Sequence, residues 1–173
     1  MSSSNIDEQA PTTVTRSGGT DDAPELRVRT ETSTYTRDDT RRHSATGVEL
    51  LASTFSAQGA TFGGPLDPPQ LLAKTPLEVG ATWSGRSTTD GMTIDATARI
   101  TRERDVTVPA GTYHCWEIQI DATITGDIDG EQHDTSCWVP DLGLPVITDQ
   151  EMNGTYSGID FRIDLHFELT ATP

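Results

Sequence analysis

Lysine, cysteine and long apolar runs are scarce in this chain. Lys74 is its only lysine, and 12 basic residues stand against 27 acidic ones, which gives a formal net charge of −15. A surface of that charge repels phosphate backbones, so nucleic acid is not an expected partner. No stretch approaches the roughly 20 apolar residues of a membrane-spanning helix, so no transmembrane segment is expected.

The beginning of the sequence lacks the pattern of an export signal. Residues 1–10 do not contain a positively charged stretch followed by an apolar one. Two locations therefore remain open. The protein is either cytoplasmic, or it belongs to the cell envelope or the extracellular space and an export signal has been removed.

Helical periodicity is also missing, because no long segment has apolar residues at spacings of three, four and seven. Residues 1–24 are rich in Ser, Thr, Gly and Asp and predict a disordered tail. Residues 25–173 predict a single all-β domain. We expect an antiparallel curved sheet of long meandering strands, either a half-barrel or a closed barrel, with few or no helices.

Three segments of the first half are less regular. Residues 37–43 (RDDTRRH) are charged throughout and predict a turn. Residues 48–55 (VELLASTF) fit either a strand or a short helix, since their periodicity does not distinguish the two. Residues 63–76 contain several prolines, which exclude a central strand and favour an extended connector.

The clearest alternation lies near the end of the chain. Residues 159–171 alternate apolar and polar side chains, which predicts a long strand with one buried face. Asn153-Gly154, just before it, predicts a type I′ hairpin turn. Folding at that turn sets Val146 opposite Phe161, and it places Trp138 on the same inward face.

The two cysteines lie on the strands that carry Trp116 and Trp138. Both tryptophans face inward if the connection between their strands has an odd number of residues. A three-residue loop at 125–127 meets this condition and sets Cys115 directly opposite Cys137 on the outward face. Opposed residues of an antiparallel pair lie about 4.5–5.5 Å apart between Cα atoms, so a disulfide is geometrically allowed. A slip of one pair would leave two free thiols.

Two turn motifs resemble a pattern of uncharacterised bacterial exported proteins, namely residues 108–113 (VPAGTY) and residues 138–144 (WVPDLGL). Residues 76–83 (PLEVGATW) resemble the segment that enters the fold in the same group. The similarity spans residues 76–146. It implies a curved antiparallel sheet similar to the lipoprotein-carrier (LolA/LolB-like) half-barrel of the cell envelope, whose members enclose acyl chains.

Nothing in the sequence indicates catalysis. The four histidines are far apart and have no metal-binding spacing, so neither a metal nor another cofactor is expected. Asp127-Ile128-Asp129-Gly130 resembles the start of a calcium loop but lacks the later acidic ligands. No glycine motif of a phosphate loop or nucleophile elbow is present. An enzyme would require polar residues that converge inside the barrel.

Two functional hypotheses follow, and both place the protein in the envelope or outside the cell. In the first, the protein is a binding module whose concave face holds a hydrophobic or lipid ligand. The expected lining residues are Trp116, Ile118, Trp138, Phe161, Ile163 and Leu165. In the second, the same residues pack into a core, and the protein is a structural or protein-interaction domain. A cavity of several hundred Å³ favours the first, and a filled barrel favours the second.

Overall fold

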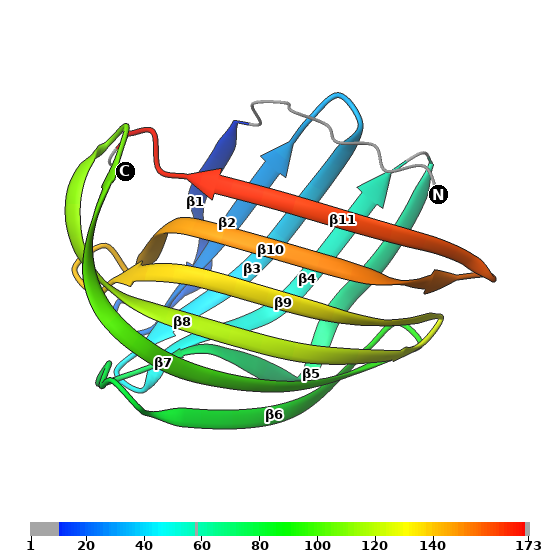
Figure 1. The fold of residues 1–173 in the computed structure, drawn as a ribbon, viewed down its shortest axis with the longest axis horizontal. Helices are drawn as coiled ribbons and strands as arrows, with labels where there is room; N and C mark the ends of the chain where they lie inside the picture. Colours follow the sequence, from blue (N-terminus) through cyan, green and yellow to red (C-terminus); the bar gives the residue numbers. More distant parts are fainter. Residues whose placement is uncertain (1–10, 58, 172–173) are drawn as a thin grey trace.

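The fold is an open antiparallel sheet that curls into a half-barrel (Figure 1). The structure, a computed structural model, describes residues 11–57 and 59–171. Within these residues the chain forms 11 strands, each paired with the next along the sequence, and no helix. The prediction of an all-β half-barrel is therefore confirmed. A helix long and apolar enough to cross a membrane is likewise not found in the described part of the chain.

The strands form two layers. The first layer contains β1 (Thr12–Gly19), β2 (Pro24–Glu31), β3 (Tyr35–Ser44), β4 (Gly47–Ala57) and β5 (Ala60–Lys74). The second contains β6 (Thr82–Thr89), β7 (Met92–Val108), β8 (Gly111–Gly126), β9 (Ile128–Val139), β10 (Leu144–Tyr156) and β11 (Ile159–Glu168). The layers join where Asp67 of β5 pairs with Thr88 of β6. In Figure 1 the strands of the first layer run obliquely behind the long curved strands of the second.

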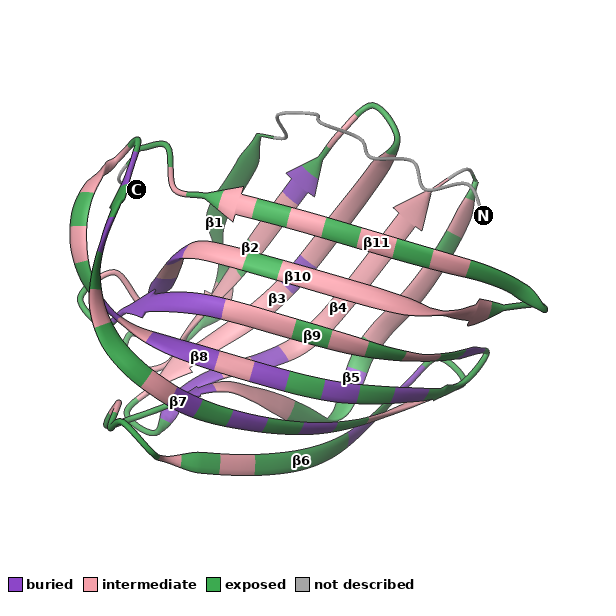
Figure 2. Ribbon diagram, viewed as in Figure 1, coloured by how far each residue is buried: buried purple, intermediate pink, exposed green. Residues whose placement is uncertain are grey.

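The main core lies between the layers, on the side where β5 joins β6. Alternation along β7 and β8 turns one apolar row of each strand toward the first layer, because successive side chains of a strand point to opposite faces. Val48 of β4 and Ala73 of β5 pack against these rows from the other layer. The buried members on β7, β8 and β9 are Ala96, Ala98, Ile100, Ile118, Ile120, Ala122 and Trp138. Figure 2 shows this burial concentrated on β7, β8 and β9.

A second apolar cluster lies on the other face of the same strands. The register of β7 and β8 shifts between Ile100 and Arg102, and this bulge reverses the facing of the rest of β7. Val106 and Val108 therefore pack beside the two cysteines rather than in the main core. The hairpin tip curls back far enough for the Ala110 N–H to donate to the carbonyl of Leu169 at 3.1 Å.

The prediction of a disordered tail over residues 1–24 is wrong for part of that range. Residues 1–10 lie outside the described residues, but Thr12–Gly19 forms β1 and β2 begins at Pro24. The side chains of β1 are nearly all exposed, so burial does not order the strand. It is held by backbone pairing with β2 and by a 2.9 Å hydrogen bond between the hydroxyls of Thr12 and Thr30.

The hairpin near the end of the chain turns four residues later than predicted. Asn153 and Gly154 continue β10, where they pair with Arg162 and Phe161. The turn is made by Ser157 and Gly158, which have φ angles of 50° and 77°. Two successive residues in the left-handed region are what a type I′ turn requires. The apolar row of β11 still faces inward, because the shift in register is even.

The two cysteines form a disulfide, but not as a directly opposed pair. Trp116 lies opposite Trp138, and Glu117 lies opposite Cys137, so Cys115 and Cys137 are diagonal neighbours with Cα atoms 5.4 Å apart. The connection between β8 and β9 is the single residue 127 instead of a three-residue loop. Its length remains odd, so both tryptophans share a face as expected.

The irregular segments of the first half all become strands. Residues 37–43 belong to β3, so the predicted turn is wrong. Residues 48–55 belong to β4, which decides between the strand and the short helix that the sequence allowed. The proline-rich segment belongs to β5, a central strand, contrary to prediction. Ala52 pairs with Pro65 and Leu50 with Gln70, so the residues between Pro65 and Gln70 do not pair with β4. The missing N–H groups of the prolines are tolerated in this interruption.

Candidate functional site

The structure does not gather the six predicted lining residues around one cavity. Ile118 and Trp138 are 0% and 5% exposed and belong to the main core, against which Trp116 packs. Phe161 packs on a third apolar cluster, with Met152 and Phe62. Ile163 and Leu165 are only half-buried, and none of the apolar clusters formed by the described residues includes them.

The half-buried residues lie on the edge strand β11, on the face that points into the half-barrel. Leu165 pairs with Gln150 of β10, and Gln150 accepts a 2.7 Å hydrogen bond from Nη1 of Arg37 on β3. Residues paired across an antiparallel ladder share a face, so Leu165 and Arg37 both point into the space between the layers. Ile163 and Phe167 alternate with Leu165 and have the same direction.

The opposite edge of the sheet also turns apolar residues inward. Val14 of β1 pairs with Val28 of β2, which pairs with Asp39 on the interior face of β3. Val14 is 37% exposed, and Leu26 and Val28 are half-buried. Since β1 and β11 are the two unpaired ends of the sheet among the described strands, these residues line the mouth of the half-barrel.

Behind this apolar mouth lies a charged row on β3, which sequence reasoning had taken for a turn. Asp39 is 3% exposed and receives Nε of Arg37 at 3.1 Å and Nη2 of Arg41 at 3.2 Å. The hydroxyl of Ser53 on β4 donates to the same carboxylate at 2.8 Å. Burial opposes ionisation of Asp39, but the two guanidinium groups and the Ser53 hydroxyl outweigh it and hold the pKa below its ordinary value.

Polar residues of β9 and β10 face this charged row from the second layer. Gln132 donates a 2.8 Å hydrogen bond to Oδ2 of Asp134. Burial raises the pKa of Asp134 above its ordinary value, and the bond from Gln132 and the charge of Arg37 oppose the rise only in part. The interior thus contains two carboxyl groups whose pKa values shift in opposite directions, that of Asp39 downward and that of Asp134 upward.

Two buried polar atoms of this interior cluster lack a hydrogen-bond partner among the described residues. Nε of Arg41 and Oδ1 of Asp134 have no hydrogen-bond partner within residues 11–57 and 59–171. An unsatisfied buried polar atom costs about 1–3 kcal/mol, so such atoms are normally met by water or by a ligand. The interior therefore has hydrogen-bonding capacity to spare beside its charged groups.

The convergence of polar groups raises the question of catalysis. Among the described residues, Ser53 is the one hydroxyl that donates to a carboxylate of this cluster. Its partner Asp39 has a lowered pKa and is therefore a weak base, which does not activate a hydroxyl as a nucleophile. Ser53 and Asp39 therefore do not form an activated nucleophile–base pair.

A separate groove lies over the outward side of β6 to β9. It has a volume of about 600 Å³ and is lined by the Arg86–Asp95 ion pair and by Asp121 and His133, which lie 2.7 Å apart. None of the six predicted lining residues takes part in it. Its walls are polar and open, so it does not match the apolar site expected from the sequence.

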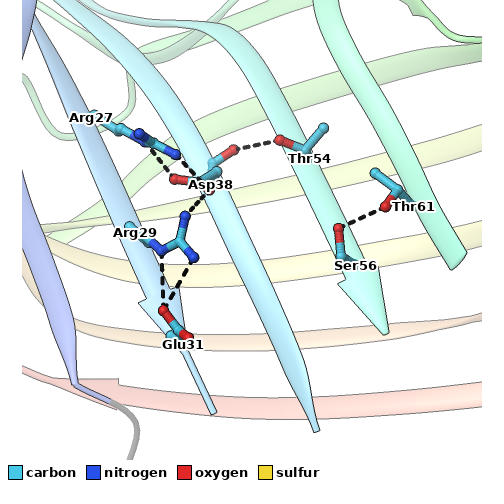
Figure 3. Close-up of polar contacts among 7 residues, drawn as sticks. All are labelled: Arg27, Arg29, Glu31, Asp38, Thr54, Ser56 and Thr61. Carbon is cyan, nitrogen blue, oxygen red and sulfur yellow. Dashed lines mark hydrogen bonds and ion pairs between the residues drawn. The ribbon is translucent and has the colours of Figure 1, made fainter. Parts of the chain in front are cut away.

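The outward face of the first layer is covered by charged and hydroxyl side chains (Figure 3). Asp38 receives Arg27 at 2.7 Å and Arg29 at 3.0 Å, and Arg29 also pairs with Glu31. Thr54 donates to the backbone carbonyl of Asp38 on the neighbouring strand. This solvent-exposed network contrasts with the buried one around Asp39, although both lie on β3.

Metal-binding geometry is not found in the described part of the chain, where no three His, Cys, Asp or Glu side chains are placed to hold an ion. Three histidines are instead exposed, each beside a carboxylate: His114 by Asp105, His133 by Asp121 and His166 by Asp149. The fourth, His43, is partly buried, and burial followed by the charge of Arg41 lowers its pKa.

Comparison with known proteins gives no relative: no family model, no curated protein and no solved structure matches this chain. The resemblance to exported β-proteins and to lipoprotein carriers therefore stays a prediction that rests on turn motifs. The functional argument depends on the geometry described above.

Proposed function

We propose that this protein is a non-catalytic binding module that holds a hydrophobic or lipid-class small molecule on its concave face. The observation that carries the proposal is the half-buried apolar row of β11, formed by Ile163, Leu165 and Phe167. Complete burial of an apolar side chain contributes roughly 1.5–3 kcal/mol, so each of these half-buried side chains has part of that energy left for a bound ligand to supply.

The disulfide supports a location in the cell envelope or outside the cell. Cys115 and Cys137 are bonded and fully buried. Structural disulfides persist mainly in oxidising compartments, whereas cytosolic thiols are kept reduced. The acidic surface, with a net charge of −15, makes proteins or apolar small molecules better partners than nucleic acid.

A second candidate function is a structural or protein-interaction domain without a ligand. The observation that favours it is the tight packing of Ile118 and Trp138, which close part of the expected site. In that case the apolar row of β11 would contact a protein partner. The two functions differ in whether the isolated protein binds a small apolar probe.

The test is equilibrium binding of the neutral apolar fluorophore N-phenylnaphthylamine. We expect the native protein to bind it and Ile163→Asn to weaken binding about tenfold, since a buried apolar contact is lost. Asp164→Asn is the matched control, because residue 164 is adjacent, exposed and outward-facing. Thermal unfolding verifies that both variants fold. A native protein that binds no probe, or two variants that bind equally well, would contradict the proposal.

A further inference from the structure

We propose that Arg37 and Arg41 bind the anionic head group of a single-chain amphiphile, whose apolar chain lies along the inner face of β11. The inference rests on the proposed function and adds to it the chemical class of the ligand. Two observations carry it. The charged row lies inside the apolar edges of the half-barrel, and buried polar atoms of this row have no hydrogen-bond partner among the described residues.

The order of residues from the mouth inward is apolar, charged and apolar. On the inward face of the edge strands, Val14 of β1 and the β11 row that contains Leu165 are apolar and partly exposed. Deeper in, Arg37 of β3, two strands from the edge β1, meets Gln150 of β10, one strand from the edge β11. Beyond them, Val48 packs with Trp138 in the main core. A ligand that enters between β1 and β11 thus meets the charged row with its leading end and the apolar mouth with the rest of its length.

The charged row has a surplus of positive charge. Arg37 and Arg41 share the single carboxylate of Asp39, whose oxygens already accept from both guanidinium groups and from Ser53. Asp134 cancels the surplus only when it is ionised, and its burial disfavours that state. The side chains of Arg37 and Arg41 are 24% and 15% exposed, so neither is completely buried.

The open hydrogen-bonding groups match an oxyanion. Nε–H of Arg41 is a donor without a partner in the described ranges, and Oδ1 of Asp134 becomes a donor when the carboxyl group is protonated. A carboxylate or phosphate accepts several such bonds, and bonds between charged groups are about twice as strong as neutral ones. On a protein of net charge −15, this row is a local site where an anion is attracted.

The test compares dodecanoate, dodecanol and acetate by isothermal titration. The proposal predicts that the protein binds dodecanoate at least about tenfold more tightly than dodecanol, because only the acid forms charge-assisted hydrogen bonds with the arginines. Acetate should bind far more weakly than dodecanoate, since it lacks the chain that contacts β11. Dodecyl phosphate should behave as dodecanoate does, because the shared feature is the anionic head.

Three variants locate the head group. Arg41→Gln should weaken dodecanoate binding much more than dodecanol binding and so remove the preference for the acid. Arg42→Gln is the matched control, since residue 42 is the next on β3, faces outward and pairs with Glu49 at 2.7 Å. Asp134→Asn should retain dodecanoate binding, because the amide carries no negative charge and keeps a hydrogen-bond donor at residue 134. A purely structural role of the cluster would change the stability of these variants but not their choice between acid and alcohol.

Each outcome is decisive. Equal affinity for dodecanoate and dodecanol, unaltered by Arg41→Gln, would overturn the head-group assignment and leave the apolar site standing. Binding of neither compound would overturn the apolar site as well. Acetate affinity equal to that of dodecanoate would show a simple anion site without an apolar subsite. The acid preference measured on the native protein stands even if Arg41→Gln fails to fold.

Discussion

Asp38 and Asp39 are neighbours in sequence, but their carboxylates lie on opposite faces of β3 and in different electrostatic surroundings. Asp38 is paired with Arg27 and Arg29 at the solvent-exposed surface. Asp39 is buried, and it neutralises part of the charge of two arginines that point into the protein. Exposed ion pairs contribute little to stability, whereas loss of one partner from a buried pair leaves an uncompensated charge.

This contrast predicts unequal effects of one substitution at the two positions. Asp39→Asn should lower the free energy of unfolding by about 3–5 kcal/mol, because Arg37 and Arg41 lose their shared counterion. Asp38→Asn should cost less than about 1 kcal/mol, because its arginines remain in contact with water. Urea denaturation measures both. If both substitutions lowered the free energy of unfolding equally, the buried ion pairs of Asp39 would contribute no more to stability than the exposed pairs of Asp38.

The three exposed histidines give the stability of the protein a pH dependence whose sign follows from their pKa shifts. A hydrogen bond to Asp105 raises the pKa of His114, and bonds to Asp121 and Asp149 do the same for His133 and His166. Each imidazole therefore holds its proton more tightly in the folded state. The resulting stability is complete below the unfolded pKa of about 6.5 and is lost as pH rises through the higher folded pKa.

We therefore expect the free energy of unfolding to fall as pH is raised from about 6.5 through the folded pKa values of these histidines. In a triple variant with glutamine at residues 114, 133 and 166, the fall should be smaller. The folded-state pKa of Asp134 is also raised, so its titration likewise lowers the free energy of unfolding as pH rises, but starting from about pH 3.9. Urea denaturation across a pH series is the measurement. An unchanged slope in the triple variant would contradict the assignment.

At the scale of elements, the close approach of β9 and β10 depends on a pair of glycines. Gly130 lies opposite Gly154. A Cβ added at Gly154 would lie 2.9 Å from the Cα of Gly130 and within 2.5 Å of the carbonyl oxygen of Asp129. Both contacts involve backbone atoms, which cannot move aside as a flexible side chain can. This explains why Asn153-Gly154 continues a strand instead of forming the predicted turn.

Gly154→Ala is accordingly expected to destabilise the protein by about 1–3 kcal/mol through crowding of the two strands. Gly85→Ala on β6 is the control, since an added Cβ there meets no atom of the described residues within 4 Å. That change should alter stability by no more than about 0.5 kcal/mol. Thermal unfolding of the two variants compares them. A harmless Gly154→Ala would indicate that the strands are not closely paired at this point.

Much of the fold could be predicted from alternation. The inward row of β11 and the shared face of Trp116 and Trp138 follow from period-two patterning, and the structure has both. Pairing register could not be predicted, because Asn153-Gly154 and Ser157-Gly158 both fit a hairpin turn. The choice between them depends on contact with β9, which no local sequence pattern reports.

The charged interior could not be predicted for a related reason. Residues 37–43 are polar on both faces of β3, so alternation gives no sign of which face is buried. One signal was present: Arg37, Asp39 and Arg41 have opposite charges at a spacing of two, so they neutralise one another on a single face. That pattern is compatible with burial, but it is equally common on exposed strands.

At the scale of the whole molecule, the sheet curls without closing. The function we propose depends on the apolar surface that remains on the inner side of its two edge strands. A closed barrel would satisfy both edges and fill its interior. Here β1 and β11 end the sheet, and in Figure 2 these strands are exposed or half-buried while β7 to β9 contain most of the buried residues. The main core therefore stabilises one side, and the other side keeps apolar surface available for a ligand.

The central claim is that the concave face binds a small apolar or amphipathic molecule. Native mass spectrometry of protein purified without detergent or denaturant, with an organic extract of the same sample, tests it most directly. The account predicts a chain mass increased by one lipid-sized molecule, which is recovered in the extract and is absent from Ile163→Asn. A bare chain mass under gentle conditions and an empty extract, together with no uptake of added dodecanoate, would contradict it.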